Sequence, residues 1–446
     1  MKTFKHLKIT TILILLSLIP GLIRVGFSQE TEILINAAEK KQVVDSIAKF
    51  MTDKYVFPDK GKEMGGLVSK NLNEGKYKDI TNHREFADKL SEDLLTINND
   101  RHIGVLYMPE RIAMIKKAEE DDDNKELEEF EKRQSEYSNF YFKEIKILPG
   151  NVGYLKFNGF MDASVAGPTA VAAMNFLAHT DALIIDLRDN GGGSPSLIQL
   201  ITTYFFEDTE HLNSFYIREG DKTKQFWTLT HVSGERLTET DLYVLTSNYT
   251  FSGAEEFTYN LKNMKRATIV GETTGGGAHP VAGHIINDNY IIRIPFGKAI
   301  NPITKTNWEG TGVEPHVKTT KDEAMETAYM LALDSLLTKE DNEDVKNTLG
   351  WATDGLKTKL EPYTLEKKDM KPYEGVYGPR KITLENGNLY YQREDRVKMQ
   401  LIPMKEDMFM FKEVDYFRVT FIKKGNKIVA IEGNYDNGTK DRHDKS

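Results

Sequence analysis

The stretch DLYVLTSNYTFSGAEEF, residues 241–257, decides how the central part of the chain folds. Its first six residues form an apolar, β-branched and aromatic run, which is typical of a buried strand. From Gly253 onward the pattern becomes helical, with Phe257 and Leu261 four residues apart. Ser252 therefore stands at the junction between a strand and a helix.

Ser252 has two interpretations at this junction. The run Ser-Gly-Ala-Glu255 fits a capping box, in which the serine accepts from the third helical amide and the glutamate reaches back. A hydroxyl at the start of a helix is also where the positive end of the helix dipole and unpaired amides favour an attacking alkoxide and its oxyanion. This stretch alone leaves both interpretations open, and residues elsewhere in the chain favour the second.

The composition excludes several classes of protein. A chain of 446 residues is long enough for two or three domains, and 28% charged with 39% hydrophobic residues indicates that most of it folds. The net charge is -9, and no face rich in lysine and arginine stands out to bind phosphates, which argues against nucleic acid as a partner. The absence of cysteine excludes disulfides, thiolate metal sites and a cysteine nucleophile.

The N-terminus has the features of a secretory signal. Three lysines in the first eight residues precede an apolar stretch at 9–19, and small residues before Gln29 suit cleavage after Ser28. The apolar run is shorter than the roughly 20 residues that a spanning helix needs. We therefore expect a signal peptide at 1–28, no membrane span after its removal, and a periplasmic or secreted bacterial protein.

Residues 29–103 are predicted to form an N-terminal helical domain, because apolar residues recur there with a helical period. This segment ends in a polar turn that contains His102. A lone histidine is more often a structural side chain, but imidazole is also the group best suited to take up a proton near neutral pH. Residues 104–145 are dominated by charge, which predicts a charged helical connector.

The segment 146–339 is predicted to be the core. The run DALIIDLR at 181–188 predicts a buried strand, and the glycine-rich turn 191–193 leads from it into a helix. The turn lacks both the Walker lysine and the dinucleotide glycine spacing, so phosphate binding is disfavoured. Glycines there let backbone amides approach a substrate carbonyl, as an oxyanion hole requires. The order of strands and helices predicts a parallel sheet with this turn and Ser252 beyond its strand ends.

The remaining segments are assigned by pattern. Residues 283–296 predict a hairpin, and a loop at 301–315 contains Glu309. Residues 340–371 are charged and predict a linker with room for a short helix. Short alternating segments with Asn-Gly turns at 372–446 predict a small all-β domain.

Four runs resemble a known family of serine peptidases: DALIIDLRDNGGG, TSNYTFSGAEEF, VGETTGGG and NWEGTGVEP, preceded by Asn-Asp-Arg-His, over roughly 100–315. The family includes the C-terminal processing (tail-specific) proteases, the tricorn core protease and interphotoreceptor retinoid-binding protein, and the tricorn and retinoid-binding branch is the best match. The resemblance implies an α/β fold, with a crotonase or Clp-protease-like β-β-α spiral core behind an N-terminal helical domain. The small β-domain lies outside it.

The resemblance also implies the site: nucleophile Ser252, general base His102, supporting acid Glu309, and oxyanion-hole amides from Gly253 and from the turn Gly191-Gly192. In such a triad the acid holds one imidazole tautomer while the other nitrogen takes the serine proton. A carboxylate beside His102 would raise the pKa of its imidazole above the ordinary 6.5 or so.

Two departures from the family pattern concern the base. The C-terminal processing proteases use a lysine twenty-five residues after the serine, and here that position is Gly277, so a Ser-Lys dyad is excluded there. The tricorn branch can carry a serine before its histidine, where this chain has Arg101, and this difference bears on how His102 is oriented. Lys298, at a predicted strand end, is the alternative base.

The sequence thus predicts a secreted serine peptidase that hydrolyses peptide or unfolded-protein substrates through an acyl-enzyme, without a cofactor or metal. The histidines show no H-E-x-x-H spacing. Two alternatives remain open. The same fold can serve a non-catalytic protein that binds a hydrophobic ligand or a peptide. Serine acyl transfer also suits an esterase.

Overall fold

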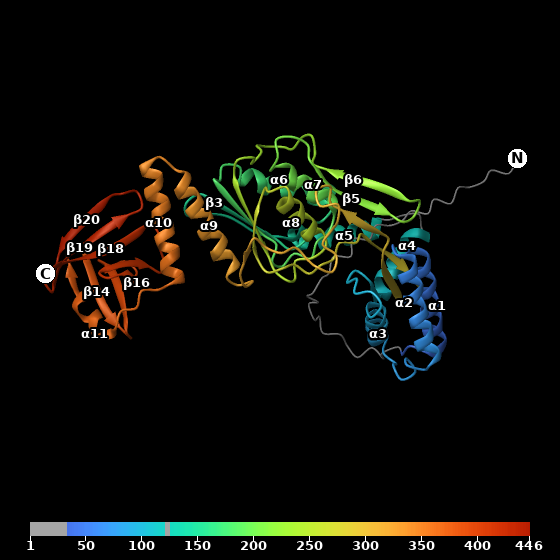
Figure 1. Ribbon diagram of the computed structural model, residues 1–446. Helices are drawn as coiled ribbons and strands as arrows, with labels where there is room; N and C mark the ends of the chain where they lie inside the picture. Colours follow the sequence, from blue (N-terminus) through green and yellow to red (C-terminus); the bar gives the residue numbers. More distant parts are fainter. Residues whose placement is uncertain (1–33, 121–124) are drawn as a thin grey trace. The chain divides into compact units, whose positions relative to one another are not determined.

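The computed structural model describes residues 34–120 and 125–446, so the predicted signal peptide lies outside the described residues. The chain forms two compact units (Figure 1). One holds the residues up to Lys146 together with Tyr154–Ala324, and the other holds Ile147–Gly153 and Met325–Ser446. Within the described ranges no helix has the length and apolarity needed to cross a membrane.

Three helices form the predicted N-terminal helical region: α1 (Ala37–Lys54), α2 (Pro58–Asn73) and α3 (His83–Leu95). Asn36 and Asn82 cap α1 and α3 through their side-chain oxygens. The apolar faces of the helices pack on an antiparallel sheet of β1 (Gly104–Tyr107), β10 (Tyr290–Pro295) and β9 (Val281–Ile285). Strands β9 and β10 are the predicted hairpin, so the helical region is built onto a segment far along the chain.

The charged connector is helical, as its composition indicates. It contains α4 (Pro109–Glu120) and α5 (Lys125–Tyr137), and α5 buries none of its side chains. A one-turn 3-10 helix, η1 (Asn139–Tyr141), leads into the core.

The core is a six-stranded sheet in the order β12-β8-β7-β4-β3-β2. Its strands are β2 (Phe142–Leu148), β3 (Val152–Phe157), β4 (Ala182–Asp186), β7 (Asp241–Thr246), β8 (Thr268–Gly271) and β12 (Val317–Lys318). The predicted parallel arrangement is confirmed for β4, β7, β8 and β12. Helices α6 (Ala163–Phe176), α7 (Pro195–Thr203) and α8 (Gly253–Asn263) contribute to one buried cluster with these strands. The glycine turn and Ser252 both follow the carboxyl ends of parallel strands.

A second sheet orders β11 (Gly297–Ile300), β5 (His211–Ile217) and β6 (Lys222–Trp227). The β5–β6 hairpin is absent from the sequence prediction, because charged residues interrupt the apolar alternation of β6. Lys298 lies on β11 opposite Tyr216, and its ammonium is 5.4 Å from the centroid of the tyrosine ring. Lys298, the alternative base, therefore makes a cation–π contact with Tyr216.

The second unit begins with α9 (Ala324–Lys339) and α10 (Glu343–Leu360), followed by the short α11 (Lys367–Met370) and η2 (Lys371–Tyr373). Helix α10 is longer than the short helix expected in the charged linker. Eight antiparallel strands follow as a meander: β13 (Gly375–Tyr377), β14 (Arg380–Glu385), β15 (Asn388–Arg393), β16 (Met399–Lys405), β17 (Met408–Phe411), β18 (Phe417–Lys424), β19 (Lys427–Tyr435) and β20 (Lys440–Asp444).

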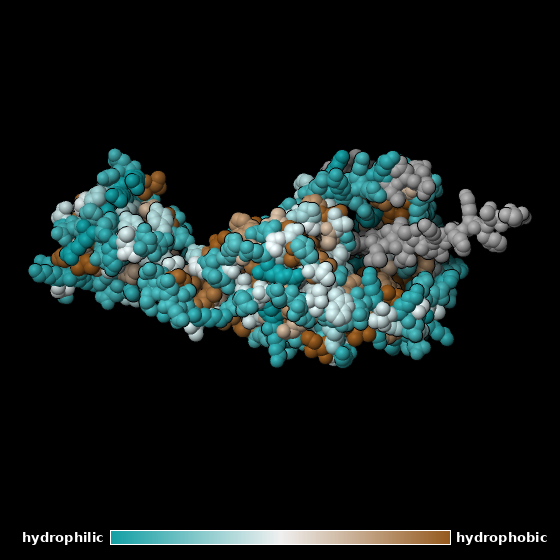
Figure 2. Space-filling view, turned by 90° about the horizontal axis from the view of Figure 1, so that it is seen from above, coloured by the Kyte–Doolittle hydropathy of each residue, from teal (hydrophilic) through white to brown (hydrophobic). Residues whose placement is uncertain are grey.

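The meander nearly closes on itself, because Tyr377 forms a bridge with Lys445 and the amide of Ser446 donates to the carbonyl of Val376. Its interior is rich in aromatic side chains. The predicted fold class, α/β with N-terminal helices and a C-terminal all-β domain, is confirmed. Hydrophilic residues predominate on the face shown in Figure 2, and hydrophobic ones occur there in scattered patches.

Candidate active site

Ser252 occupies a strained backbone conformation at the start of α8. Its φ is 55° and its ψ is -119°, a region that residues other than glycine rarely adopt and that costs about 1–3 kcal/mol. The carboxylate of Glu255 accepts the amide of Ser252 at 2.9 Å, which is the glutamate half of the predicted capping box. The same carboxylate accepts the amides of Gly276 and Gly277 at 2.7 and 2.8 Å. Glu255 thus fixes Ser252 to a second glycine-rich loop, at residues 275–277.

His102 meets Ser252 although 150 residues separate them in the chain. The Nε2 atom of His102 lies 2.9 Å from the Oγ atom of Ser252, and the imidazole also packs on the ring of Phe251 with centroids 4.8 Å apart. The backbone amide of His102 donates to Asp100 at 3.2 Å, which fixes the short loop before β1. The predicted nucleophile and the predicted base are therefore within hydrogen-bond distance.

Burial sets the protonation state of His102. The residue is 4% exposed, and burial lowers the pKa of its imidazole to about 4. The charge of Asp100 acts in the opposite direction, while Arg293, His279 and Arg101 act in the same direction as burial. The carboxylate of Asp100 does act to raise this pKa, as expected of a neighbouring carboxylate, but the loss of solvation outweighs it and the net shift is downward. The imidazole is neutral near pH 7, as proton acceptance from serine requires.

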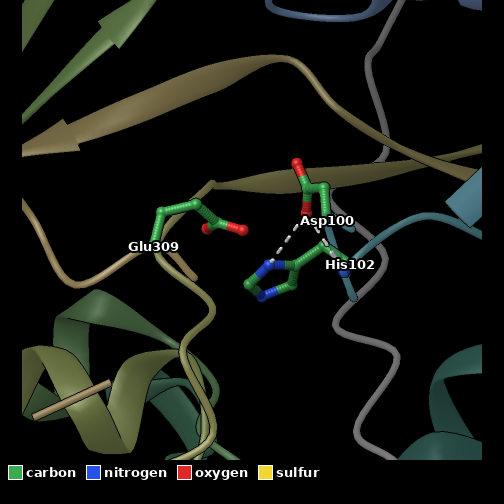
Figure 3. Close-up of side chains that lie close together, drawn as sticks. All are labelled: Asp100, His102 and Glu309. Carbon is green, nitrogen blue, oxygen red and sulfur yellow. Dashed lines mark hydrogen bonds and ion pairs between the residues drawn. The ribbon is translucent and has the colours of Figure 1, made fainter. Parts of the chain in front are cut away.

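Two carboxylates, not one, face the other side of the imidazole (Figure 3). A ring nitrogen of His102, a carboxylate oxygen of Asp100 and a carboxylate oxygen of Glu309 all lie within 4.8 Å of one another. The Oδ1 atom of Asp100 is 3.7 Å from Nδ1 of His102, while Glu309 accepts the amide of Ala278 at 2.6 Å. Within the described chain the buried Nδ1 atom of His102 has no hydrogen-bond partner. Glu309 is therefore beside the base as predicted, but without a hydrogen bond to it.

Neither Asp100 nor His279 is among the site residues predicted from the sequence. The Nδ1 atom of His279 lies 2.6 Å from Oδ2 of Asp100 and 3.5 Å from Oε2 of Glu309. The signal for Asp100 was present, because a carboxylate two residues before a candidate base can reach the same side of its ring. His279 had no such local signal, since it joins the site only through the fold.

The glycine turn after β4 lies against the start of α8. A Cβ atom on Gly192 would be 2.6 Å from the amide nitrogen of Gly253, and one on Gly253 would be 2.9 Å from that of Gly193. The amides of Gly191 and Gly192 already donate, to Asn158 at 3.3 Å and to Asn190 at 2.9 Å. Among the described residues, the amides of Gly193 and Gly253 donate no such hydrogen bond. The geometry favours Gly193 over Gly191 and Gly192 as the second oxyanion donor.

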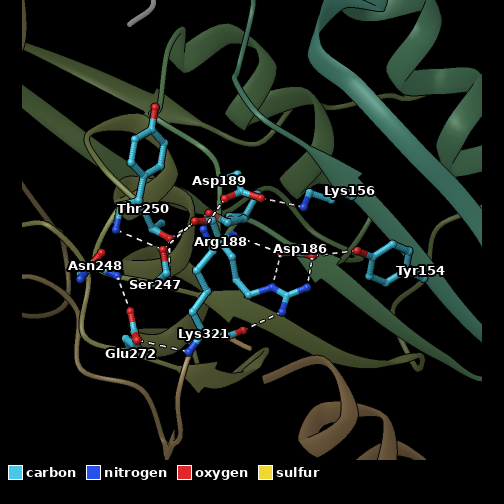
Figure 4. A network of polar contacts seen from close by, with 12 residues as sticks. Tyr154, Lys156, Asp186, Arg188, Asp189, Ser247, Asn248, Thr250, Glu272 and Lys321 are labelled. Atoms are coloured by element: carbon cyan, nitrogen blue, oxygen red, sulfur yellow. Dashed lines mark hydrogen bonds and ion pairs between the residues drawn. The ribbon is translucent and has the colours of Figure 1, made fainter. Parts of the chain in front are cut away.

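A polar network fixes the two loops that carry these amides and Ser252 (Figure 4). Asp186, at the end of β4, accepts two hydrogen bonds from the guanidinium of Arg188, at 2.9 and 2.7 Å, and one from Tyr154 at 2.7 Å. Burial acts to raise the pKa of Asp186, but the hydrogen bonds from Arg188 outweigh it and hold the pKa below its usual value. Ser247 and Thr250 then donate to the carbonyls of residues 188 and 187. The loops after β4 and β7 are thereby joined.

Arg101, the residue before His102 that departs from the family pattern, points to the glycine-rich loop at residues 275–277. Its guanidinium donates to the carbonyl of Gly275 at 2.9 Å and lies 5.0 Å from the centroid of the Phe251 ring. The imidazole of His102 also contacts the Phe251 ring. Arg101 and His102 therefore share a contact with Phe251, and the charge of Arg101 acts to lower the pKa of His102.

Gly277 lies twenty-five residues after Ser252, where the resemblance to C-terminal processing proteases would place a lysine. A Cβ atom there would lie 2.8 Å from Cε1 of His102 and 2.2 Å from Cζ of Phe251. These distances are shorter than any normal carbon contact. A side chain at 277 and the observed position of His102 therefore exclude each other.

Gly277→Ala is accordingly expected to displace His102 and to lower turnover by about 10²-fold or more, because misplacement of a reacting group by about 1 Å can cost that much. The measurement is hydrolysis of a fluorogenic peptide, with thermal unfolding followed in parallel. Gly66→Ala is the matched control, since a Cβ on Gly66 in α2 would meet nothing within 4 Å. Full turnover in the Gly277 variant would show that the imidazole has more room than these contacts indicate.

Comparison with known proteins identifies the family. A family model described as peptidase family S41 matches residues 151–319, and the model for the N-terminal domain of Peptidase_S41 in eukaryotic IRBP matches residues 26–144. The chain belongs to peptidase family S41. The resemblance inferred from the four runs of sequence is confirmed at the level of the family.

Individual relatives are distant. The carboxy-terminal processing protease CtpB of Bacillus subtilis (strain 168) is 24% identical over 208 residues, which cover 46% of this chain and 42% of CtpB. The match thus spans less than half the length of that relative. Among solved structures, a putative peptidase from Parabacteroides merdae is 18% identical, with a TM-score of 0.47 and coverage of 66% of this chain and 98% of that one. The photosystem II D1 C-terminal processing protease is 15% identical, with a TM-score of 0.40 and coverage of 65% and 94%.

Proposed function

We propose that this protein is a serine peptidase that hydrolyses peptide bonds through an acyl-enzyme on Ser252. The observation that carries the proposal is the 2.9 Å contact between Oγ of Ser252 and Nε2 of His102 in a member of peptidase family S41. Two further features support it. The backbone of Ser252 is strained, as is common at active sites. The burial of His102 keeps its imidazole neutral, so that it can activate the serine as a general base.

In the proposed reaction neutral His102 takes the hydroxyl proton of Ser252 while Oγ attacks the substrate carbonyl. The amides of Gly253 and Gly193 would donate to the oxyanion of the tetrahedral intermediate. The imidazolium then gives its proton to the leaving amine. In the second half of the reaction His102 takes a proton from a water molecule that attacks the acyl-enzyme, and then returns a proton to Oγ of Ser252 as the acid product leaves. Glu309 would stabilise the imidazolium by charge, because its carboxylate and the imidazole lie within 4.8 Å.

The proposed substrates are peptides or unfolded proteins, in line with the peptidase family and with the name of CtpB as a processing protease. We also propose export to the periplasm or the exterior, on the basis of the basic and apolar N-terminal sequence and the residues before Gln29. N-terminal sequencing of the exported protein should then begin at or next to Gln29. A mature chain that begins at Met1 would contradict export by this route.

The direct test of the function is labelling of the full chain with a fluorophosphonate, which reacts with activated serines. The adduct is expected on the peptide that contains Ser252, and turnover of a peptide and of an ester substrate by the same preparation separates a peptidase from an esterase. A protein that is folded but takes no label at Ser252 would instead be a binding protein on this fold.

A further inference from the structure

His279 lies between the two carboxylates behind the candidate base. It comes from the loop between β8 and β9, it is 4% exposed, and its Nδ1 atom is 2.6 Å from Asp100 and 3.5 Å from Glu309. The hydroxyl of Tyr55, at the end of α1, donates to the same Asp100 oxygen at 3.1 Å. Asp100 is therefore held by two donors on one oxygen, and its other oxygen faces His102.

The charges of this cluster are coupled. Burial opposes the charge of His279, but the hydrogen bond and charge of Asp100, together with Glu309, outweigh it and raise the pKa of His279 above its ordinary value. Burial also acts to raise the pKa of Asp100, which His279 and His102 nevertheless hold below its usual range. Burial and then the charge of Asp100 raise the pKa of Glu309. The hydrogen bond between Asp100 and His279 thus favours the charged form of each partner.

Other charged groups also face the cluster. Lys298 on β11 lowers the pKa of His279, and Arg293 on β10 and Arg101 before His102 lower that of His102. These cations oppose a second positive charge on the histidines. The carboxylates must therefore supply the stabilisation when His102 becomes protonated.

Because Nε2 of His102 faces Ser252 and takes its proton, the other ring proton lies on Nδ1 before and after the transfer, and this N–H group needs an acceptor most when the ring is charged. The imidazolium of His102 carries a proton on Nδ1, and this buried atom has no hydrogen-bond partner in the resting, described structure. The Oδ1 atom of Asp100 is 3.7 Å away, so a shift of less than about 1 Å brings it within the usual 2.7–3.2 Å of a hydrogen bond. The carboxylate of Glu309 instead accepts the amide of Ala278 at 2.6 Å.

We propose that Asp100 is the carboxylate that positions His102 by accepting a hydrogen bond from the Nδ1–H group of its imidazolium, and that protonated His279 positions Asp100 and separates it from Glu309. The inference rests on the proposed peptidase function and deepens it. Asp100 and His279 are positioning residues, since neither reaches the reacting atoms.

A consequence is a second, alkaline limb in the pH dependence of activity. As pH rises through the raised pKa of His279, the imidazolium loses its charge and two carboxylates face each other without a cation between them. Asp100 is then less firmly held, and activity falls. The wild-type profile of kcat against pH is therefore expected to decline above a midpoint that lies higher than the ordinary histidine value of about 6.5.

The experiment compares Asp100→Asn, His279→Asn and wild type over pH 4–10, using kcat and KM on a fluorogenic peptide and the rate of fluorophosphonate labelling at Ser252. Asp100→Asn is expected to lower kcat by about 10²–10⁴-fold with little change in KM, as loss of the orienting acid does in a serine triad. His279→Asn places an uncharged N–H donor near the position of Nδ1. It is expected to lower kcat about tenfold or less and to remove the alkaline limb.

The control is His284→Asn. His284 lies five residues after His279 in the chain, and its ring stacks on Phe50 instead of contacting Asp100. Its pH profile is expected to match wild type. An unchanged kcat and pH profile in both positioning variants would overturn the inference. A wild-type profile with no alkaline limb would overturn it too, and this result does not depend on how the variants fold. Loss of labelling in Ser252→Ala would leave the peptidase proposal standing in that case, whereas wild-type labelling of Ser252→Ala would overturn the peptidase proposal itself.

Discussion

Ser252→Ala is expected to reduce peptide hydrolysis by about 10⁶-fold, the loss seen when the nucleophile is removed from a serine protease triad. The reason is that the Oγ atom is the group that His102 contacts at 2.9 Å, and alanine leaves nothing for the imidazole to deprotonate. Turnover of a fluorogenic peptide by purified wild-type and variant protein measures the effect. Wild-type turnover in the variant would remove Ser252 from the mechanism.

The stability of Ser252→Ala separates catalysis from capping. Loss of a helix cap costs about 0.5–2 kcal/mol, and the smaller value is expected here because Glu255 still accepts the amide of residue 252. Asn342→Ala is the matched control, since Asn342 caps α10 by accepting the amides of Asp344 and Val345. It is expected to lower the midpoint of thermal unfolding similarly and to leave turnover unchanged. Collapse of the fold in Ser252→Ala alone would favour the capping interpretation.

Elements that a local pattern specifies could be predicted from the sequence. The run before Thr246 is apolar and β-branched, and the turn and helix signals after it follow directly, so the strand, Ser252 and α8 were placed correctly. The hairpin 211–227 was missed because β6 exposes most of its side chains and carries lysines. Its stability comes from pairing with β5 and not from a buried face of its own.

The cluster behind the base could not be predicted in the same way. Asp100 and His279 are 179 residues apart, and only the packing of the N-terminal helices on the β9–β10 hairpin brings them together. The direction of the His102 pKa shift has a similar origin. Sequence suggests a carboxylate neighbour, which would raise the pKa, but the degree of burial is a property of the folded chain and it dominates.

His102→Ala is expected to lower turnover about as much as Ser252→Ala, and the double variant is expected to be little worse than either single one, because the two residues act as a unit. His231→Ala, at an exposed histidine, is the control and should retain full turnover. Lys298→Met should retain it too, since the lysine lies over the Tyr216 ring. High activity in His102→Ala combined with loss in Lys298→Met would reassign the base to Lys298.

The acid limb of the wild-type pH profile tests the same residue without a substitution. Proton acceptance requires neutral His102, so kcat/KM, which reports the free enzyme, rises with pH through the pKa of this imidazole. Burial lowers that pKa to about 4, so activity is expected to be half-maximal near pH 4 and complete by about pH 6, well below the ordinary histidine value of about 6.5. A midpoint at or above 6.5 would mean that the carboxylates outweigh burial when the site is in solution. The position of this midpoint therefore measures which of the two opposing effects on His102 is larger.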